Sequence, residues 1–175
     1  MRLAIWTSLL GALLPGVTGC GQEQTWEAVN RMIASDFPNV HHISTDSLAA
    51  WLSDSTRQPP LILDAREPAE YAVSHLPGAI RIDPDATDFS FLDSLNHEGG
   101  IVAYCSVGYR SSGLAEKLEE AGYTGVFNLQ GSIFRWANEG RPVYRDGVQV
   151  REVHPYDRLW GTLLQKELRR YEAGK

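Results

Sequence analysis

Positive charge is scarce in this chain of 175 residues, since 22 acidic residues outnumber 16 basic ones and the formal net charge is −6. With no basic excess to attract a phosphate backbone, the composition argues against nucleic acid as a partner. The sequence also shows no internal repeat and no low-complexity segment. Its content of 43% hydrophobic and 22% charged residues predicts one soluble globular domain.

Metal-ligand patterns are lacking as well. His41 and His42 are adjacent in the sequence, and no ligand-type residues follow them at the spacing of a zinc site. His75 precedes Pro77 and Gly78, which favours a place in a turn. We therefore expect no bound metal.

A hydrophobic run follows Arg2 at the N-terminus, "LAIWTSLLGALLPGV". It is short for a membrane span and typical of the core of a signal peptide. The run leads to Val17-Thr-Gly-Cys20, which resembles the lipobox of bacterial lipoproteins, where the cysteine is acylated after cleavage. We expect residues 1–19 to be a lipoprotein-type signal peptide and Cys20 to carry the lipid. The alternatives are an ordinary secretory signal and an uncleaved anchor.

Acylation of Cys20 would attach the protein to a membrane of the cell envelope, facing outside the cytoplasm. Cysteine is otherwise almost absent, because the chain has only two. Cys105 would then be the only thiol of the mature protein, without an intramolecular disulfide partner. A lone cysteine is most often a buried small hydrophobe, so its neighbours must decide its role.

Beyond residue 40, short apolar segments alternate with helical patterns. The pattern predicts strands over 61–65, 79–82, 101–105 and 126–129, and helices over 44–54, 67–75, 88–95, 110–123 and 131–140. Such alternation predicts an α/β fold, a parallel sheet flanked by helices on both faces, with a site at the carboxyl ends of the strands. Cys105 falls at such an end.

Helical extensions are predicted on both sides of this unit. Residues 20–39 form an N-terminal linker and helix, and residues 146–175 form a C-terminal helical extension that docks on the body. The predicted inward positions of the first are Trp26, Val29 and Ile33. In the second, a predicted helix over 154–172 has an apolar stripe along one face, formed by Trp160, Leu164, Leu168 and Tyr171.

The stretch "YCSVGYRSS" (104–112) carries the chemistry. A strand that ends at Cys105 delivers the sulfur to a loop, and the free amides of that loop and of the next helix favour an anion there. Gly108 lets the backbone curl so that the amides converge, and Arg110 adds positive charge. These features predict a thiolate at neutral pH.

Four motifs resemble the single-domain rhodaneses, sulfurtransferases that carry sulfur as a cysteine persulfide. They are "CSVGYRS" (105–111), "DAREPAEY" (64–71), "HLPGA" (75–79) and "LQGSIFRW" (129–136). The resemblance covers about residues 40–145 and implies a rhodanese-like domain there. One departure is Ser132, where a second glycine is usual, and we expect it to affect packing more than chemistry.

The resemblance also implies roles for particular residues. Cys105 forms the persulfide, Arg110 closes the loop around it, and Asp64 and Arg66 border the site. The remaining loop residues expected to contact substrate are Ser106, Val107, Gly108, Tyr109 and Ser111. For Asp64 and Arg66 a structural role remains open, since they could pair with each other or with Glu70.

We therefore predict a monomeric sulfurtransferase that moves sulfur from a donor such as thiosulfate to cyanide or a thiol and needs no cofactor. The first alternative is a phosphatase or arsenate reductase, because relatives with this fold use the same loop for oxyanions. Those relatives carry one more residue than the four, 106–109, between Cys105 and Arg110. The second alternative is a non-catalytic, membrane-tethered binding module.

The lipobox resemblance generates a testable prediction. The mature protein should begin at Cys20, carry acyl mass and partition into detergent, as intact mass spectrometry and phase separation would show. Cys20→Ser should release the protein into the soluble fraction or leave an unprocessed precursor, whereas Cys105→Ser should stay in the detergent phase. An unmodified Cys20 thiol in the mature protein would contradict the lipoprotein interpretation.

Overall fold

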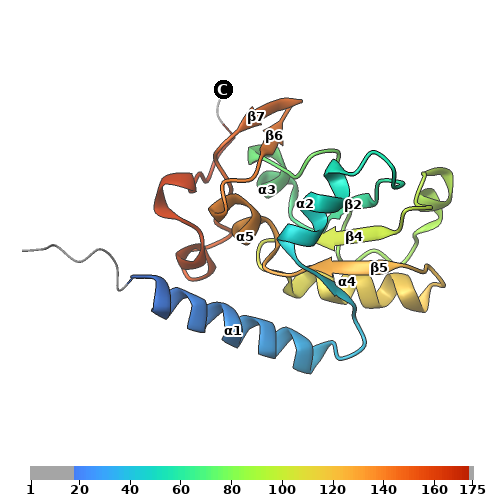
Figure 1. Ribbon diagram of the computed structural model, residues 1–175, viewed down its shortest axis with the longest axis horizontal. Helices are drawn as coiled ribbons and strands as arrows, with labels where there is room; N and C mark the ends of the chain where they lie inside the picture. Colours follow the sequence, from blue (N-terminus) through green and yellow to red (C-terminus); the bar gives the residue numbers. More distant parts are fainter. Residues whose placement is uncertain (1–17, 174–175) are drawn as a thin grey trace, which may run out of the picture.

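The structure, a computed structural model, describes residues 18–173 (Figure 1). Residues 1–17 of the predicted signal peptide lie outside the described part of the chain. So does the Cys20 side chain, although its backbone belongs to the first helix, α1 (Thr18–Asp36). Among the described residues, no helix is long and apolar enough to cross a membrane.

Five parallel strands form the central sheet in the order β1-β5-β4-β2-β3. Their bounds are β1 His42–Ile43, β2 Leu61–Asp64, β3 Ile80–Arg81, β4 Ile101–Tyr104 and β5 Val126–Leu129. The predicted parallel sheet is confirmed, with β4 at its centre. The sequence pattern missed β1, because two residues whose side chains are not buried show no apolar period.

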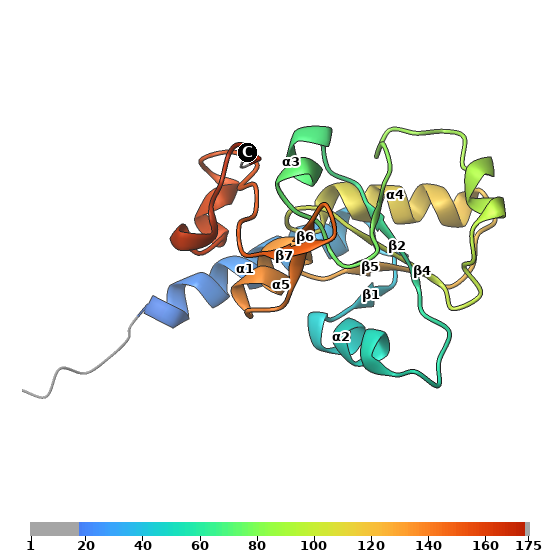
Figure 2. The ribbon, with the colours of Figure 1, turned by 90° about the horizontal axis from the view of Figure 1, so that it is seen from above.

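Helices cover both faces of the sheet, as predicted (Figure 2). One face packs against α2 (Thr45–Ser53) and α5 (Ser132–Asn138), and the other against α4 (Tyr109–Glu120) and a 3₁₀ helix, η1 (Ser90–Ser94). Alternate side chains of β4 enter the two cores, Val102 and Tyr104 on one side and Ile101 and Ala103 on the other.

The predicted helices are confirmed with a change of type in η1, which was expected as an α-helix over 88–95. The short α3 (Pro68–Val73) follows β2 and begins with a capping box. The Glu67 side chain accepts a hydrogen bond from the Glu70 backbone amide, and the Glu70 side chain accepts one from the Glu67 backbone amide. In α1, Trp26, Val29 and Ile33 are buried as predicted.

The C-terminal extension docks on the body, but the single helix predicted over 154–172 is wrong. A hairpin of β6 (Val143–Arg145) and β7 (Val148–Val150) leads into two short 3₁₀ helices, η2 (Trp160–Leu163) and η3 (Lys166–Leu168). The segment lies beside α5 and α1 (Figure 1). Leu164 and Leu168 are buried, whereas Tyr171 is 55% exposed.

Tertiary hydrogen bonds explain why this helix does not form. The Asn138 side chain donates to the Leu163 carbonyl at 2.7 Å and accepts from the Gln165 amide at 2.9 Å. The Arg169 guanidinium donates to the Leu164 carbonyl at 2.7 Å. Backbone groups that a helix would pair internally are bound instead by Asn138 of α5 and by the Arg169 side chain of the segment itself.

A buried ion pair lies at the carboxyl end of β2. Asp64 and Arg66 are both 0% exposed, and Arg66 Nη2 lies 2.6 Å from Asp64 Oδ2. Arg66 also donates to the Ser74 carbonyl at 2.6 Å, and the Tyr104 hydroxyl donates to the Asp64 carboxylate. Burial, and then the charge of Asp64, raises the pKa of the Tyr104 phenol. The network joins the ends of β2 and β4 to the segment after α3.

Removing one member of this network should destabilise the fold strongly. Asp64→Ala leaves the Arg66 guanidinium buried without its counter-charge, and we expect the free energy of unfolding to fall by about 3–5 kcal/mol. Urea denaturation would measure it. The matched control is Asp46→Ala, which removes an exposed carboxylate paired with Arg141 and should cost far less. Equal losses in the two variants would contradict a stabilising role for the buried pair.

Candidate active site

Cys105 occupies the first position after β4, at the carboxyl edge of the sheet. The chain then turns through Gly108, whose φ of 117° is the left-handed cap of α4. The Gly108 amide donates a hydrogen bond to Cys105 Sγ at 3.2 Å. A Cβ at position 108 would lie 3.3 Å from both the Asn128 amide nitrogen and the Ile33 side chain, so the close approach requires glycine.

The loop lowers the pKa of the Cys105 thiol. Burial acts in the opposite direction and is the largest single effect, because the cysteine is 1% exposed. The positive charge of Arg110 and hydrogen bonds from Ser111 and the Gly108 amide outweigh it. The loop therefore makes the thiolate easier to form, which is the direction that the sequence predicts.

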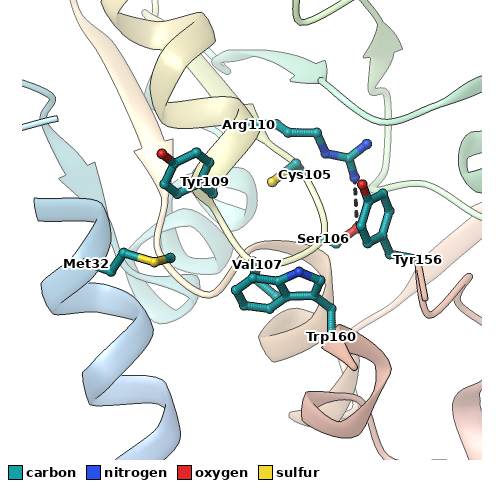
Figure 3. A pocket seen from close by; sticks show the side chains of 8 residues that line it. All are labelled: Met32, Cys105, Ser106, Val107, Tyr109, Arg110, Tyr156 and Trp160. Carbon is teal, nitrogen blue, oxygen red and sulfur yellow. Dashed lines mark hydrogen bonds between the residues drawn. The ribbon is translucent and has the colours of Figure 1, made fainter. Parts of the chain in front are cut away.

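Arg110 is held by Glu70 of α3. Its Nη1 and Nη2 donate to the two carboxylate oxygens at 2.8 and 3.0 Å, a bidentate pair. The Ser106 hydroxyl donates to the same carboxylate at 2.8 Å and accepts from Arg110 at 3.1 Å (Figure 3). This triangle ties both ends of the Cys105 loop to one carboxylate.

Sequence reasoning considered Glu70 only as a partner for Asp64 and Arg66, and missed its part in the site. Burial raises the pKa of the Glu70 carboxyl, but the hydrogen bonds and charge of Arg110 outweigh burial and lower it. The Glu70 bond raises the pKa of Arg110 in turn, against the effect of burial. The capping-box spacing of Glu67 and Glu70 fixes this carboxylate at the start of α3, and that spacing was the available signal.

Ser132 does more than the predicted packing. Its φ of 50° is in the left-handed region, which explains why a glycine suits this position. Its hydroxyl accepts a hydrogen bond from the Cys105 amide at 3.1 Å and donates one to the Leu129 carbonyl at 3.1 Å. The serine thus joins the ends of β4 and β5 at the residue that carries the sulfur.

A cavity of about 260 Å³ opens above the sulfur, and the Cys105 side chain points into it (Figure 3). Its lining residues are Met32, Cys105, Ser106, Val107, Tyr109, Arg110, Tyr156 and Trp160. Of the predicted loop residues, Ser106, Val107 and Tyr109 therefore line one cavity together with Cys105 and Arg110, with Tyr109 at the wall. Met32, Tyr156 and Trp160 were missed, because they come from the two extensions and carry no local motif.

The other predicted site residues lie outside the cavity lining. The Gly108 amide donates to the sulfur from within the protein, whereas the Ser111 hydroxyl donates to Asn128 at 2.6 Å. Asp64 and Arg66 pair with each other beneath the loop, as in the structural alternative. Cys20 has no described side chain.

The arrangement suits a nucleophilic sulfur more than acid–base chemistry. The described side chains that line the cavity include a thiol and a guanidinium but no carboxylic acid. Among residues 18–173, no group of three or more His, Cys, Asp or Glu residues is placed to hold a metal ion. A parallel sheet, a buried thiol with a lowered pKa and a loop amide that donates to its sulfur are features of proteins that use a cysteine against sulfur or oxyanion groups.

Comparison with known proteins specifies the class. Residues 44–139 match the model of the Rhodanese-like domain, and the chain belongs to this family. A sulfurtransferase of Allochromatium vinosum is 32% identical over 104 residues, 59% of this chain and 94% of that protein. These similarities support a sulfurtransferase-type function at the level of the family.

Two further relatives agree with this assignment. A probable adenylyltransferase/sulfurtransferase, MoeZ of Mycobacterium tuberculosis, is 34% identical over 101 residues, 57% of this chain but only 25% of that protein. The crystal structure of a rhodanese-like domain protein from Staphylococcus aureus superposes with a TM-score of 0.51 at 31% identity, covering 61% of this chain and 99% of that chain.

The lowered pKa of Cys105 predicts how its alkylation depends on pH. The rate of reaction with iodoacetamide should follow the thiolate, with a midpoint below that of an unperturbed cysteine. Arg110→Gln should move the midpoint to higher pH, because the stabilising charge is lost and Glu70 is left uncompensated. Lys117→Gln removes a more exposed cation of the same helix and should leave the midpoint unchanged. An unshifted midpoint in Arg110→Gln would contradict the proposed electrostatics.

Proposed function

We propose that the protein is a sulfurtransferase that carries a sulfane sulfur as a persulfide on Cys105. The observation that supports this most is the contact between the Gly108 amide and Cys105 Sγ, at 3.2 Å, at the base of an open cavity. The thiol has a lowered pKa and direct access to a small donor. Thiosulfate is the simplest such donor, and cyanide or a thiol is the acceptor.

The reaction proceeds in two displacements. The Cys105 thiolate attacks the outer sulfur of thiosulfate, a sulfur–sulfur bond forms on the protein, and sulfite leaves with the electron pair of the broken bond. Cyanide then attacks the outer sulfur of the persulfide, thiocyanate leaves, and the thiolate returns. The Gly108 amide and the charge of Arg110 stabilise the anionic sulfur, and no cofactor takes part.

The short loop favours sulfur over phosphate. Four residues, 106–109, separate Cys105 from Arg110, and phosphate-hydrolysing relatives carry one more. A persulfide extends the thiolate by about 2.05 Å. One added residue lengthens the loop contour by up to roughly 3.3 Å, which is more than that step. The loop of this chain should therefore fit a bound sulfur and crowd a phosphoryl group.

Intact mass spectrometry tests the proposed function. Incubation with excess thiosulfate should add one sulfur atom to the protein, and cyanide should then remove it. Cys105→Ser should abolish both changes while circular dichroism shows the fold retained, because only the nucleophile is altered. Aryl phosphate hydrolysis should be negligible under the same conditions. Brisk phosphate hydrolysis with no sulfur uptake would assign the protein to the phosphatase class, and inertness toward both would indicate a binding module.

A further inference from the structure

The outer wall of the cavity comes from segments outside the Rhodanese-like domain match of residues 44–139. Met32 belongs to α1, and Tyr156 and Trp160 belong to the C-terminal segment. These side chains face the sulfur of Cys105 across the cavity (Figure 3). The domain supplies the nucleophile and the loop around it, whereas the extensions supply the facing wall of the cavity.

Charge in the cavity does not suit a dianion. Arg110 is the one charged side chain among the described residues that line it. Both terminal nitrogens of Arg110 are engaged by the Glu70 carboxylate, and its guanidinium lies 4.7 Å from the centre of the Tyr156 ring. An ion pair presents little net charge to a ligand, so a doubly charged donor would lose its hydration without gaining an unpaired cation.

Apolar surface is plentiful by contrast. Val107, Tyr109 and Trp160 surround the sulfur together with Met32. A second hollow of about 300 Å³ shares Met32 and Trp160 with the first and extends between α1 and the C-terminal segment, toward Ala28 and Leu159. The space is far larger than one transferred sulfur needs, and it approaches the size of cavities that hold small organic ligands.

We propose that the preferred donor is an organic sulfane, a terminal sulfur that carries at most one negative charge and is bonded through a second sulfur atom to an apolar, ring-sized group. The inference rests on the proposed sulfur transfer and specifies its substrate class. The apolar group packs against Met32 and Trp160, and the terminal sulfur meets Cys105. In the reaction, the Cys105 thiolate bonds to the terminal sulfur, the bond between that sulfur and the second sulfur of the donor breaks, and the organic fragment leaves as a sulfinate or thiolate with the electron pair.

Three donors of known chemistry test the inference, with cyanide as acceptor. Thiosulfate is a dianion without an organic group, methanethiosulfonate is a monoanion with a methyl group, and benzenethiosulfonate is a monoanion with a ring. From either thiosulfonate, Cys105 takes the terminal sulfur and a sulfinate leaves. We expect kcat/KM to be highest for benzenethiosulfonate and lowest for thiosulfate.

Variants of the cavity wall separate the binding of the donor's organic group from the intrinsic reactivity of each donor. The ratio of kcat/KM for benzenethiosulfonate to that for methanethiosulfonate should fall about tenfold in Trp160→Ala, because the ring loses its apolar partner. Met32→Ala, at a position 37% exposed, should lower the ratio in the same direction without threatening the fold. Phe91→Ala removes an exposed aromatic ring of η1 outside the cavity and should leave the ratio unchanged.

The outcomes distinguish this inference from the function on which it rests. Sulfur uptake with thiosulfate as the best donor, or a ratio unchanged in both wall variants, would overturn the substrate class and leave sulfur transfer intact. Failure of all three donors to load Cys105 would overturn both. A lowered ratio in both wall variants and not in Phe91→Ala supports the inference.

Discussion

The bidentate pair between Arg110 and Glu70 is the interaction on which the site depends. A guanidinium so close to the carboxyl edge of the sheet needs a counter-charge, and Glu70 is fixed by the capping box of α3 to provide it. Because Ser106 binds the same carboxylate, the loop is fastened at both ends around Cys105. The pair also limits which anions the cavity can bind, because both terminal nitrogens of Arg110 already donate to Glu70.

Periodicity and local motifs predict those parts of the fold that are encoded locally. The strand that leads to Cys105, the helix that begins beside Arg110 and the glycine between them follow from apolar runs and from the geometry of a tight turn. The roles of Glu70 and Ser132 could not be predicted from the sequence, because each residue binds a partner far away along the chain. The parallel packing of β4 against β2 and β5 brings these partners together, and no local pattern records it.

The C-terminal extension is a second case in which tertiary contacts decide the structure and the local sequence pattern does not. Its apolar spacing indicates a helix, yet Asn138 and Arg169 engage the backbone groups that a helix would need. Tyr156, at a φ of 64°, turns the chain back so that its ring covers Arg110. Burial of Leu164 and Leu168 is preserved in either conformation, which is why docking was predictable and the backbone path was not.

The burial of Cys105 also limits which chemistry can reach it from large molecules. The thiol is free and 1% exposed, and residues of α1 and of the C-terminal segment line the cavity above it. A disulfide to another protein would require a second sulfur to come within about 2.05 Å, and a cysteine on a folded surface cannot enter so far. We therefore expect Cys105 to be slow to form a disulfide with a cysteine of another folded protein.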